Sequence, residues 1–180
     1  VFDERGWLDL AIGAASVLRD VHLGADGLVR TSLDGVAGDT PGTAEDYGAV
    51  ALAFSRLAGV TGDATWLRHA VVLCERAVER FGADDGGFFD AVASGVFARP
   101  RDVADNPTPS GTTSLVAALR HVGLLADRPD LVERADAALR TTWGTVAANP
   151  RFAPAALTEV LAADEADALG HDVPGGGVAA

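Results

Sequence analysis

The feature that most constrains the fold of this chain is a series of apolar stripes with helical spacing. Leu8, Ile12, Ala15 and Leu18 recur at intervals of three or four positions, as on one face of an amphipathic helix. Similar stripes follow at 47–58, 67–81, 115–125 and 131–142, with a weaker one at 152–163. The pattern predicts an all-α fold.

Residues that favour helix starts precede several of these stripes. Thr43 and Asp46 have the spacing of a capping box, in which each side chain hydrogen-bonds to the backbone of the other residue. Asp63 and Asp127 each follow a short turn and precede a stripe, so both are expected to be N-cap residues. The helices predicted from periodicity and from start signals therefore coincide.

The connections between the stripes alternate in length. Short connections at about 59–62 and 126–128 alternate with long ones at about 23–42 and 82–108. In a row of antiparallel helices, successive connections lie at opposite ends. We therefore expect antiparallel helical hairpins with both long loops at the same end, and long loops in a compact domain usually carry function.

The second long loop has the residue pattern of a small β-hairpin. Asp84-Asp85-Gly86-Gly87 precedes the apolar pair Phe88-Phe89, and Ser94-Gly95 precedes Val96-Phe97. We expect a β-hairpin insertion between Gly87 and Arg99 to hold the only strands of the fold. The first long loop has a fainter version of this pattern at 26–30.

Composition excludes several classes of function. The 14 basic residues, all arginines, face 26 acidic ones, and a net charge of -12 disfavours nucleic acid and anionic membranes as partners. No apolar run is long enough for a bilayer span. A single cysteine, Cys74, excludes an internal disulfide and suits the reducing cytoplasm. The four histidines lack metal-ligand spacing, so neither a metal nor another cofactor is expected.

The candidate site lies where the helices starting near Thr43 and Ser110 meet the long loops. Free N–H groups there would favour carboxylates and neutral, hydroxyl-rich ligands. The candidate residues are Glu45, Asp46, Tyr47, Phe89, Arg99, Arg101, Asp102, Asp105, Asn106 and Ser110. Asp46 and Asp105 are the candidate catalytic pair, because glycosyl transfer needs two carboxylates across a cleft. Alternatively, Asp46 only closes the capping box, Asp105 only forms a turn, and Arg99 only makes a structural ion pair.

A series of motifs from Trp7 to Pro154 gives a resemblance to a known family. The motifs are Glu45-Asp46-Tyr47, Thr61-Gly62-Asp63, Trp66-Leu67, Gly86-Gly87-Phe88-Phe89-Asp90, Arg99-Pro100-Arg101-Asp102 and Asp105-Asn106-Pro107-Thr108-Pro109-Ser110-Gly111. In this order they resemble the helical region of YyaL-type thioredoxin-domain-containing proteins, relatives of spermatogenesis-associated protein twenty. The resemblance implies an (α/α)6 toroid similar to six-hairpin glycosidases, preceded by a thioredoxin-like domain.

The resemblance also implies how the chain is organised. Residues 1–165 would form part of a toroid, as the C-terminal part of a longer protein, and residues 166–180 a flexible tail. The expected partners are then the N-terminal half of the toroid and the thioredoxin-like domain. A half ring would leave Phe54, Leu57, Leu119 and Val122 partly exposed, which would favour a partner domain or a homodimer.

Two functions are compatible with the sequence. One is carbohydrate binding or processing at the mouth formed by the long loops. The other is a non-catalytic helical scaffold that supports a thioredoxin-like domain or a protein partner. The distance between the two carboxylates of the site would separate hydrolysis from the scaffold.

Overall fold

The computed structural model describes residues 5–92 and 98–168. These ranges contain six α-helices, a π-helical turn at Leu18–His22 and a 3-10 turn at Pro150–Phe152. The helices are α1 (Arg5–Val17), α2 (Ala44–Thr61), α3 (Ala64–Phe81), α4 (Gly111–Leu125), α5 (Pro129–Ala148) and α6 (Pro154–Ala168). The all-α class is confirmed. No helix in these ranges combines the length and the apolar character needed to cross a membrane.

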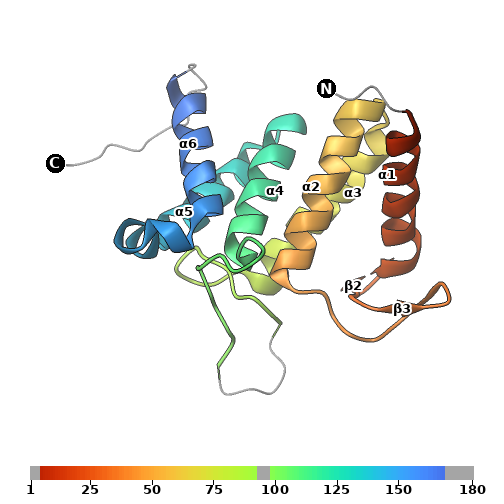
Figure 1. The fold of residues 1–180 in the computed structure, drawn as a ribbon, viewed down its shortest axis with the longest axis horizontal. Coiled ribbons are helices and arrows are strands. Elements are labelled where there is room, and N and C mark those ends of the chain that lie inside the picture. Colours follow the sequence, from red (N-terminus) through yellow and green to blue (C-terminus); the bar gives the residue numbers. More distant parts are fainter. Residues whose placement is uncertain (1–4, 93–97, 169–180) are drawn as a thin grey trace.

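The helices form two rows (Figure 1). α2, α4 and α6 make the front row, in which α4 packs against both α2 and α6. α3 packs behind α2, and α5 packs behind α4. The helices of the front row all start at the end where the long loops emerge, and α3 and α5 run back toward it. The predicted antiparallel hairpins are therefore confirmed.

Capping residues fix the starts of two predicted helices as expected. The Asp46 carboxylate accepts a hydrogen bond from the backbone N–H of Thr43 at 2.7 Å, within the predicted capping box. Asp63 is the N-cap of α3 and accepts from the Thr65 N–H at 2.8 Å. The expectation for Asp127 is wrong: α5 starts at Pro129, which suits a first helical turn, and Asp127 lies in the preceding turn with φ 53°.

The described strands lie in the first long loop. β1 (Leu23–Gly24) pairs with β2 (Gly27–Leu28), and β3 (Ser32–Leu33) pairs with β4 (Val36–Ala37), both antiparallel. The second hairpin turns at Asp34 and Gly35, which have φ 50° and 78° and so match the positive φ of a two-residue hairpin turn. The fold thus contains the small β insertion that was expected, at a different position.

The expectation of strands only at Gly87–Arg99 is wrong. The described part of that segment makes a single isolated bridge, between Gly82 and Phe88. Its Asp-Gly residues form a tight turn instead, in which the Asp85 carboxylate accepts from the Gly87 N–H at 2.9 Å. The expected second half of the hairpin, with Ser94-Gly95 and Val96-Phe97, includes residues 93–97, which lie outside the described residues.

The core lies between the two rows. Tyr47 on α2 meets Phe81 on α3 edge to face, with ring centroids 5.2 Å apart, and Phe54 contacts Trp66 at the same centroid distance. The predicted exposure of the front row's apolar residues is wrong, because the neighbouring helices cover them. The buried residues concerned are Phe54, Leu57, Leu119 and Val122, all 9% exposed or less.

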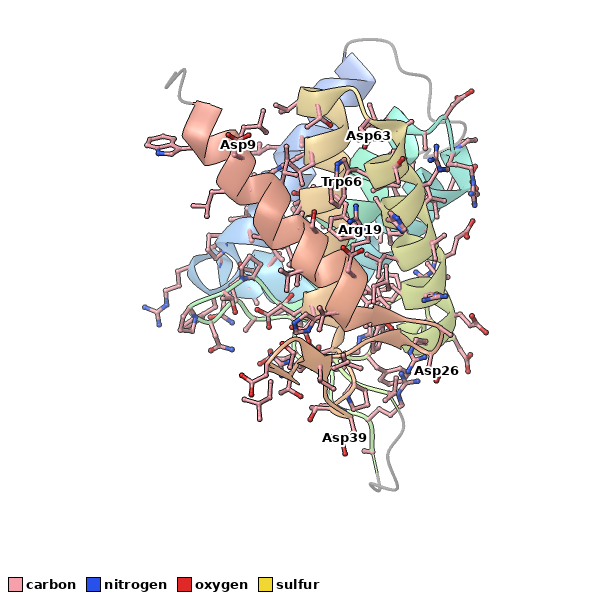
Figure 2. The ribbon with its side chains drawn as sticks, turned by 90° about the vertical axis from the view of Figure 1, so that its right-hand side faces the viewer. Asp9, Arg19, Asp26, Asp39, Asp63 and Trp66 are labelled. Carbon is pink, nitrogen blue, oxygen red and sulfur yellow. The ribbon has the colours of Figure 1, made fainter. Side chains whose placement is uncertain are left out.

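α1 covers the open side of α2 and α3. Leu8, Ile12 and Leu18 pack against the core while remaining partly exposed. At the end of this segment the Arg19 guanidinium lies over the Trp66 ring, 5.0 Å from its centroid, as Figure 2 shows from the side of α1. At the other end of the chain, α6 continues past residue 165, the predicted domain boundary, to Ala168. The rest of the predicted tail, 169–180, lies outside the described residues.

The contact between α2 and α4 depends on Gly48. A Cβ atom at this position would lie 2.5 Å from the backbone carbon of Ser114 on α4 and 2.8 Å from the Leu115 nitrogen. Backbone atoms cannot rotate away as a flexible side chain would. The absence of a side chain at Gly48 therefore sets how closely the two helices approach.

We expect Gly48→Ala to destabilise the fold by about 1–3 kcal/mol, because the new methyl group separates α2 from α4. Gly59→Ala is the matched control on the same helix, where a Cβ meets no atom within 4 Å. Removing the flexibility of this second glycine should instead stabilise α2 by about 0.5–1 kcal/mol. Urea unfolding measures both. Equal effects of the two substitutions would contradict this account of the contact.

Candidate functional site

The candidate site lies where α2 and α4 begin. A Cβ atom on Gly111, the first residue of α4, would lie 3.0 Å from the Ala44 Cβ and 3.2 Å from the Asp90 Oδ1. The Ala44 N–H in turn donates to the Asp90 carbonyl at 2.9 Å. These contacts bring together two helix starts and the second long loop, at the lower end of Figure 1. The predicted convergence of this loop with both helix starts is confirmed.

An open pocket of about 200 Å³ occupies this end of the molecule. Four of the predicted residues line it: Glu45, Asp102, Asn106 and Ser110. Arg30 and Asp90 also line it, and neither was a predicted site residue. We call this the mouth pocket. It brings together carboxylates, an amide, a hydroxyl and a guanidinium from three segments of the chain.

Asp46, one of the two candidate catalytic residues, serves the start of α2. Its Oδ2 accepts from both the N–H and the hydroxyl of Thr43, at 2.7 and 2.8 Å. The same oxygen pairs with the Arg30 Nε at 2.9 Å. Asp46 is not among the residues that line the mouth pocket. The contacts of Asp46 therefore match the alternative in which it only closes the capping box.

Asp105, the other candidate catalytic residue, joins two helix starts. Its Oδ1 accepts from the Ser110 N–H at 2.9 Å, and its Oδ2 accepts from the Ala155 N–H at 2.8 Å. Ser110 is the N-cap of α4, and Ala155 lies in the first turn of α6. Both carboxylate oxygens are thus occupied by backbone groups, and Asp105 also lies outside the pocket lining.

Three further predicted residues hold the loops in place. The buried Tyr47 hydroxyl accepts from the Leu28 N–H at 2.8 Å and so ties the first long loop to α2. Arg99 lies over the Phe89 ring at 4.2 Å and donates to the Arg80 carbonyl at 2.6 Å. These contacts fasten the second loop to α3. None of these three predicted residues lines the mouth pocket.

Arg101 has a similar supporting role. It pairs with Asp85 at 2.5 Å and donates to the Thr141 hydroxyl at 2.9 Å. Through these contacts it joins the turn after α3 to helix α5. The predicted residues thus divide into those that line the pocket and those that position its loops.

Three of the pocket residues have uncommitted polar side chains. Within the part of the chain that the structure describes, the Glu45 carboxylate, the Asn106 amide and the Thr108 hydroxyl have no hydrogen-bond partner. Ser110 differs, because its hydroxyl donates to the Thr113 hydroxyl and accepts from the Thr113 N–H. Glu45 and Asn106 are therefore available to a ligand, while Ser110 caps α4.

Asp90 is the most unusual group in the pocket. Half-burial raises the pKa of its carboxyl group above the ordinary value, the nearby negative charge of Asp102 adds to this shift, and a hydrogen bond from the Asp102 N–H opposes it. Asp90 closes the Gly-Gly-Phe-Phe-Asp segment, which was its only sequence signal. Arg30 had no such signal, because only the folded loop brings it to Asp46.

The charges of the pocket restrict the ligands that fit. Glu45, Asp90 and Asp102 face one guanidinium, that of Arg30, which already pairs with Asp46. The helix starts offer less than expected to an anion, because Asp46, Asp105 and Ser110 occupy N–H groups there. Negative ligands are therefore disfavoured, and neutral hydroxyl-rich ligands remain suitable.

Side chains that could support metal or thiol chemistry are not gathered here. Among the described residues, no three His, Cys, Asp or Glu side chains form a group that could hold a metal ion. Cys74 is buried in the core, and burial raises the pKa of its thiol to about 12. The thiol is thus protonated at neutral pH, and Cys74 does not line the mouth pocket.

Comparison with known proteins adds no relative to this picture. No protein-family model matches the chain, and no curated protein matches it.

We expect Asp105→Ala to destabilise the fold by about 1–3 kcal/mol, because two backbone N–H groups lose their acceptors. Asp105→Asn retains one acceptor oxygen, so its loss should be smaller. Asp39→Ala, at an exposed position of the first long loop, is the control and should change the free energy of unfolding little. Urea unfolding tests the order. A fold unaffected by Asp105→Ala would refute the joining role.

The raised pKa of Asp90 predicts the sign of a pH effect. The unfolded chain loses this proton at a lower pH than the folded chain does. The stability of wild type relative to Asp90→Asn should therefore fall as pH rises from the ordinary aspartate pKa to the raised one, then stay constant.

Asp130→Asn is the control of opposite sign, because the hydrogen bond from Arg128 lowers the pKa of Asp130. There, the stability of wild type relative to the variant should rise as pH rises from the lowered pKa to the ordinary one. Urea unfolding between about pH 2.5 and 7 measures both differences. A difference for Asp90 that grows with pH would contradict the burial argument.

Proposed function

We propose that the mouth pocket binds a neutral carbohydrate. The observation that carries the proposal is that two side chains of complementary chemistry in the pocket, the Glu45 carboxylate and the Asn106 amide, are uncommitted. A sugar hydroxyl donates to a carboxylate and accepts from an amide, so one sugar ring can satisfy both. The surplus of carboxylates favours a neutral sugar over a sugar acid or sugar phosphate.

The arrangement of the helices supports the same proposal. Helices that start together at one end and a second row behind them are what a segment of an (α/α)6 toroid would have. On this proposal the chain is the helical part of a thioredoxin-domain-containing protein of the YyaL type. Its location would be the cytoplasm, where the one cysteine, Cys74, needs no disulfide partner.

Within this proposal, Asp90 and Glu45 replace Asp46 and Asp105 as the acidic groups that meet the sugar. The Asp90 Oδ2 already accepts from the Asp102 N–H, which leaves Oδ1, near the start of α4, to accept from a sugar hydroxyl. Glu45 lies in the first turn of α2 and can accept from another sugar hydroxyl. The two carboxylates would thus hold one ligand from two segments of the chain.

Titration of the labelled protein with glucose, galactose, mannose and N-acetylglucosamine, followed by NMR, tests this function. We expect at least one sugar to shift the backbone signals of the pocket residues in a saturable way. Glu45→Ala and Asn106→Ala should each weaken that binding about 5- to 10-fold, since each removes one hydrogen bond.

Asp9→Ala is the control, because Asp9 is exposed at the end of the molecule opposite to the loops (Figure 2). It should leave the affinity unchanged. Glucuronate and glucose 6-phosphate should bind more weakly than the best neutral sugar. A pocket that responds to none of these sugars would overturn the proposal and favour the scaffold alternative.

A further inference from the structure

The mouth pocket continues into a second hollow between the helices of the front row. This groove of about 380 Å³ lies among α2, α4 and α6. Glu45, Thr108 and Pro109 line both the groove and the mouth pocket, so the two spaces share a wall. The groove is therefore the immediate neighbour of the mouth pocket.

The groove differs from the mouth pocket in chemistry. Its apolar lining comes from small side chains, such as Ala49 on α2, Ala117 on α4 and Ala155 on α6, together with Leu52. Glu159 on α6 is the other charged residue that lines it besides Glu45. Half-burial raises the pKa of Glu159, while the positive charges of Arg120 and Arg56 oppose the shift. The surroundings of this carboxyl group are thus poorly hydrated.

The size and lining of the groove suit a small molecule. Small-molecule sites usually span about 300–1,000 Å³ and combine apolar walls with a few polar groups. The mouth pocket and the groove together have these properties.

We propose that the ligand is a glycoside with an apolar aglycone, whose sugar binds in the mouth pocket and whose apolar group lies in the groove. This inference rests on the proposed function, because it assigns the sugar to the mouth pocket. Glu45 stands at the junction, next to the position of the glycosidic oxygen. A free sugar would leave the apolar walls of the groove in water and so would gain no affinity from their burial.

A series of n-alkyl β-D-glucosides from methyl to octyl, each below its micelle concentration, tests the inference by calorimetry. We expect the affinity to rise about 2- to 4-fold for each added methylene until the groove is full. In NMR titrations the longer chains should also raise the pKa of Glu159 further, because they displace water from its surroundings.

Ala49→Phe places a bulky group in the groove and should abolish the increase with chain length. Ala49 is exposed, so the fold should tolerate the change. Ala53→Phe is the matched control, because Ala53 is exposed one turn further along α2, outside the groove. It should leave the series unchanged.

The outcomes separate the two proposals. If no methyl glycoside binds, the proposed function fails. If a methyl glycoside binds, the alkyl series is made on that sugar, and an affinity that does not grow with chain length overturns the groove inference alone. An increase that persists in Ala49→Phe also overturns it. So does a dimer in sedimentation that Ala49→Phe breaks, because a second copy then occupies the groove.

Discussion

The close approach of α2 and α4 is the contact on which the rest of the structure depends. Gly48 lets α2 lie against the backbone of α4, and Gly111 lets the start of α4 lie against Ala44. Because the two helices run in the same direction, this contact brings their starts side by side (Figure 1). The loops that lead into them must then meet, and the mouth pocket forms between those loops.

The starts of these helices also decide which carboxylates are available to a ligand. The first N–H groups of a helix have no partner inside it, so nearby side chains accept from them. Asp46 does so for α2, and Asp105 does so for α4 and α6. These two carboxylates are thereby used for structure. Glu45 and Asp90 line the mouth pocket instead, Glu45 from the first turn of α2 and Asp90 from the loop after α3.

Sequence patterns predicted the helices and the end of the molecule at which the long loops meet, but not which helix covers which stripe or where the hairpins form. Periodicity located the helices, and loop lengths located both long loops at one end of them. The exposure expected at Phe54 and Val122 was wrong, because a stripe does not show which helix covers it, and α3 and α5 already do. The hairpin was misplaced for a local reason: Asp34-Gly35 is the stronger turn signal, whereas Asp85 closes its turn on Gly87. No sequence pattern identified Arg30 as a pocket residue, because it reaches the pocket only when the first long loop folds back onto α2 and pairs with Asp46.

The burial of large side chains in the core is linked to the groove on the other face of the front row. Most of the large apolar side chains of α2 and α4 are buried in the core, where α2 packs against α3 and α4 against α5. Apart from Leu52, the opposite face of the two helices has small or polar residues, such as Ala49, Ser114 and Ala117. Small side chains on neighbouring helices leave a hollow between them, and this hollow meets the mouth pocket at Glu45. The same partition of side chains that stabilises the core thus creates the groove, so the fold and the candidate site have a common physical origin.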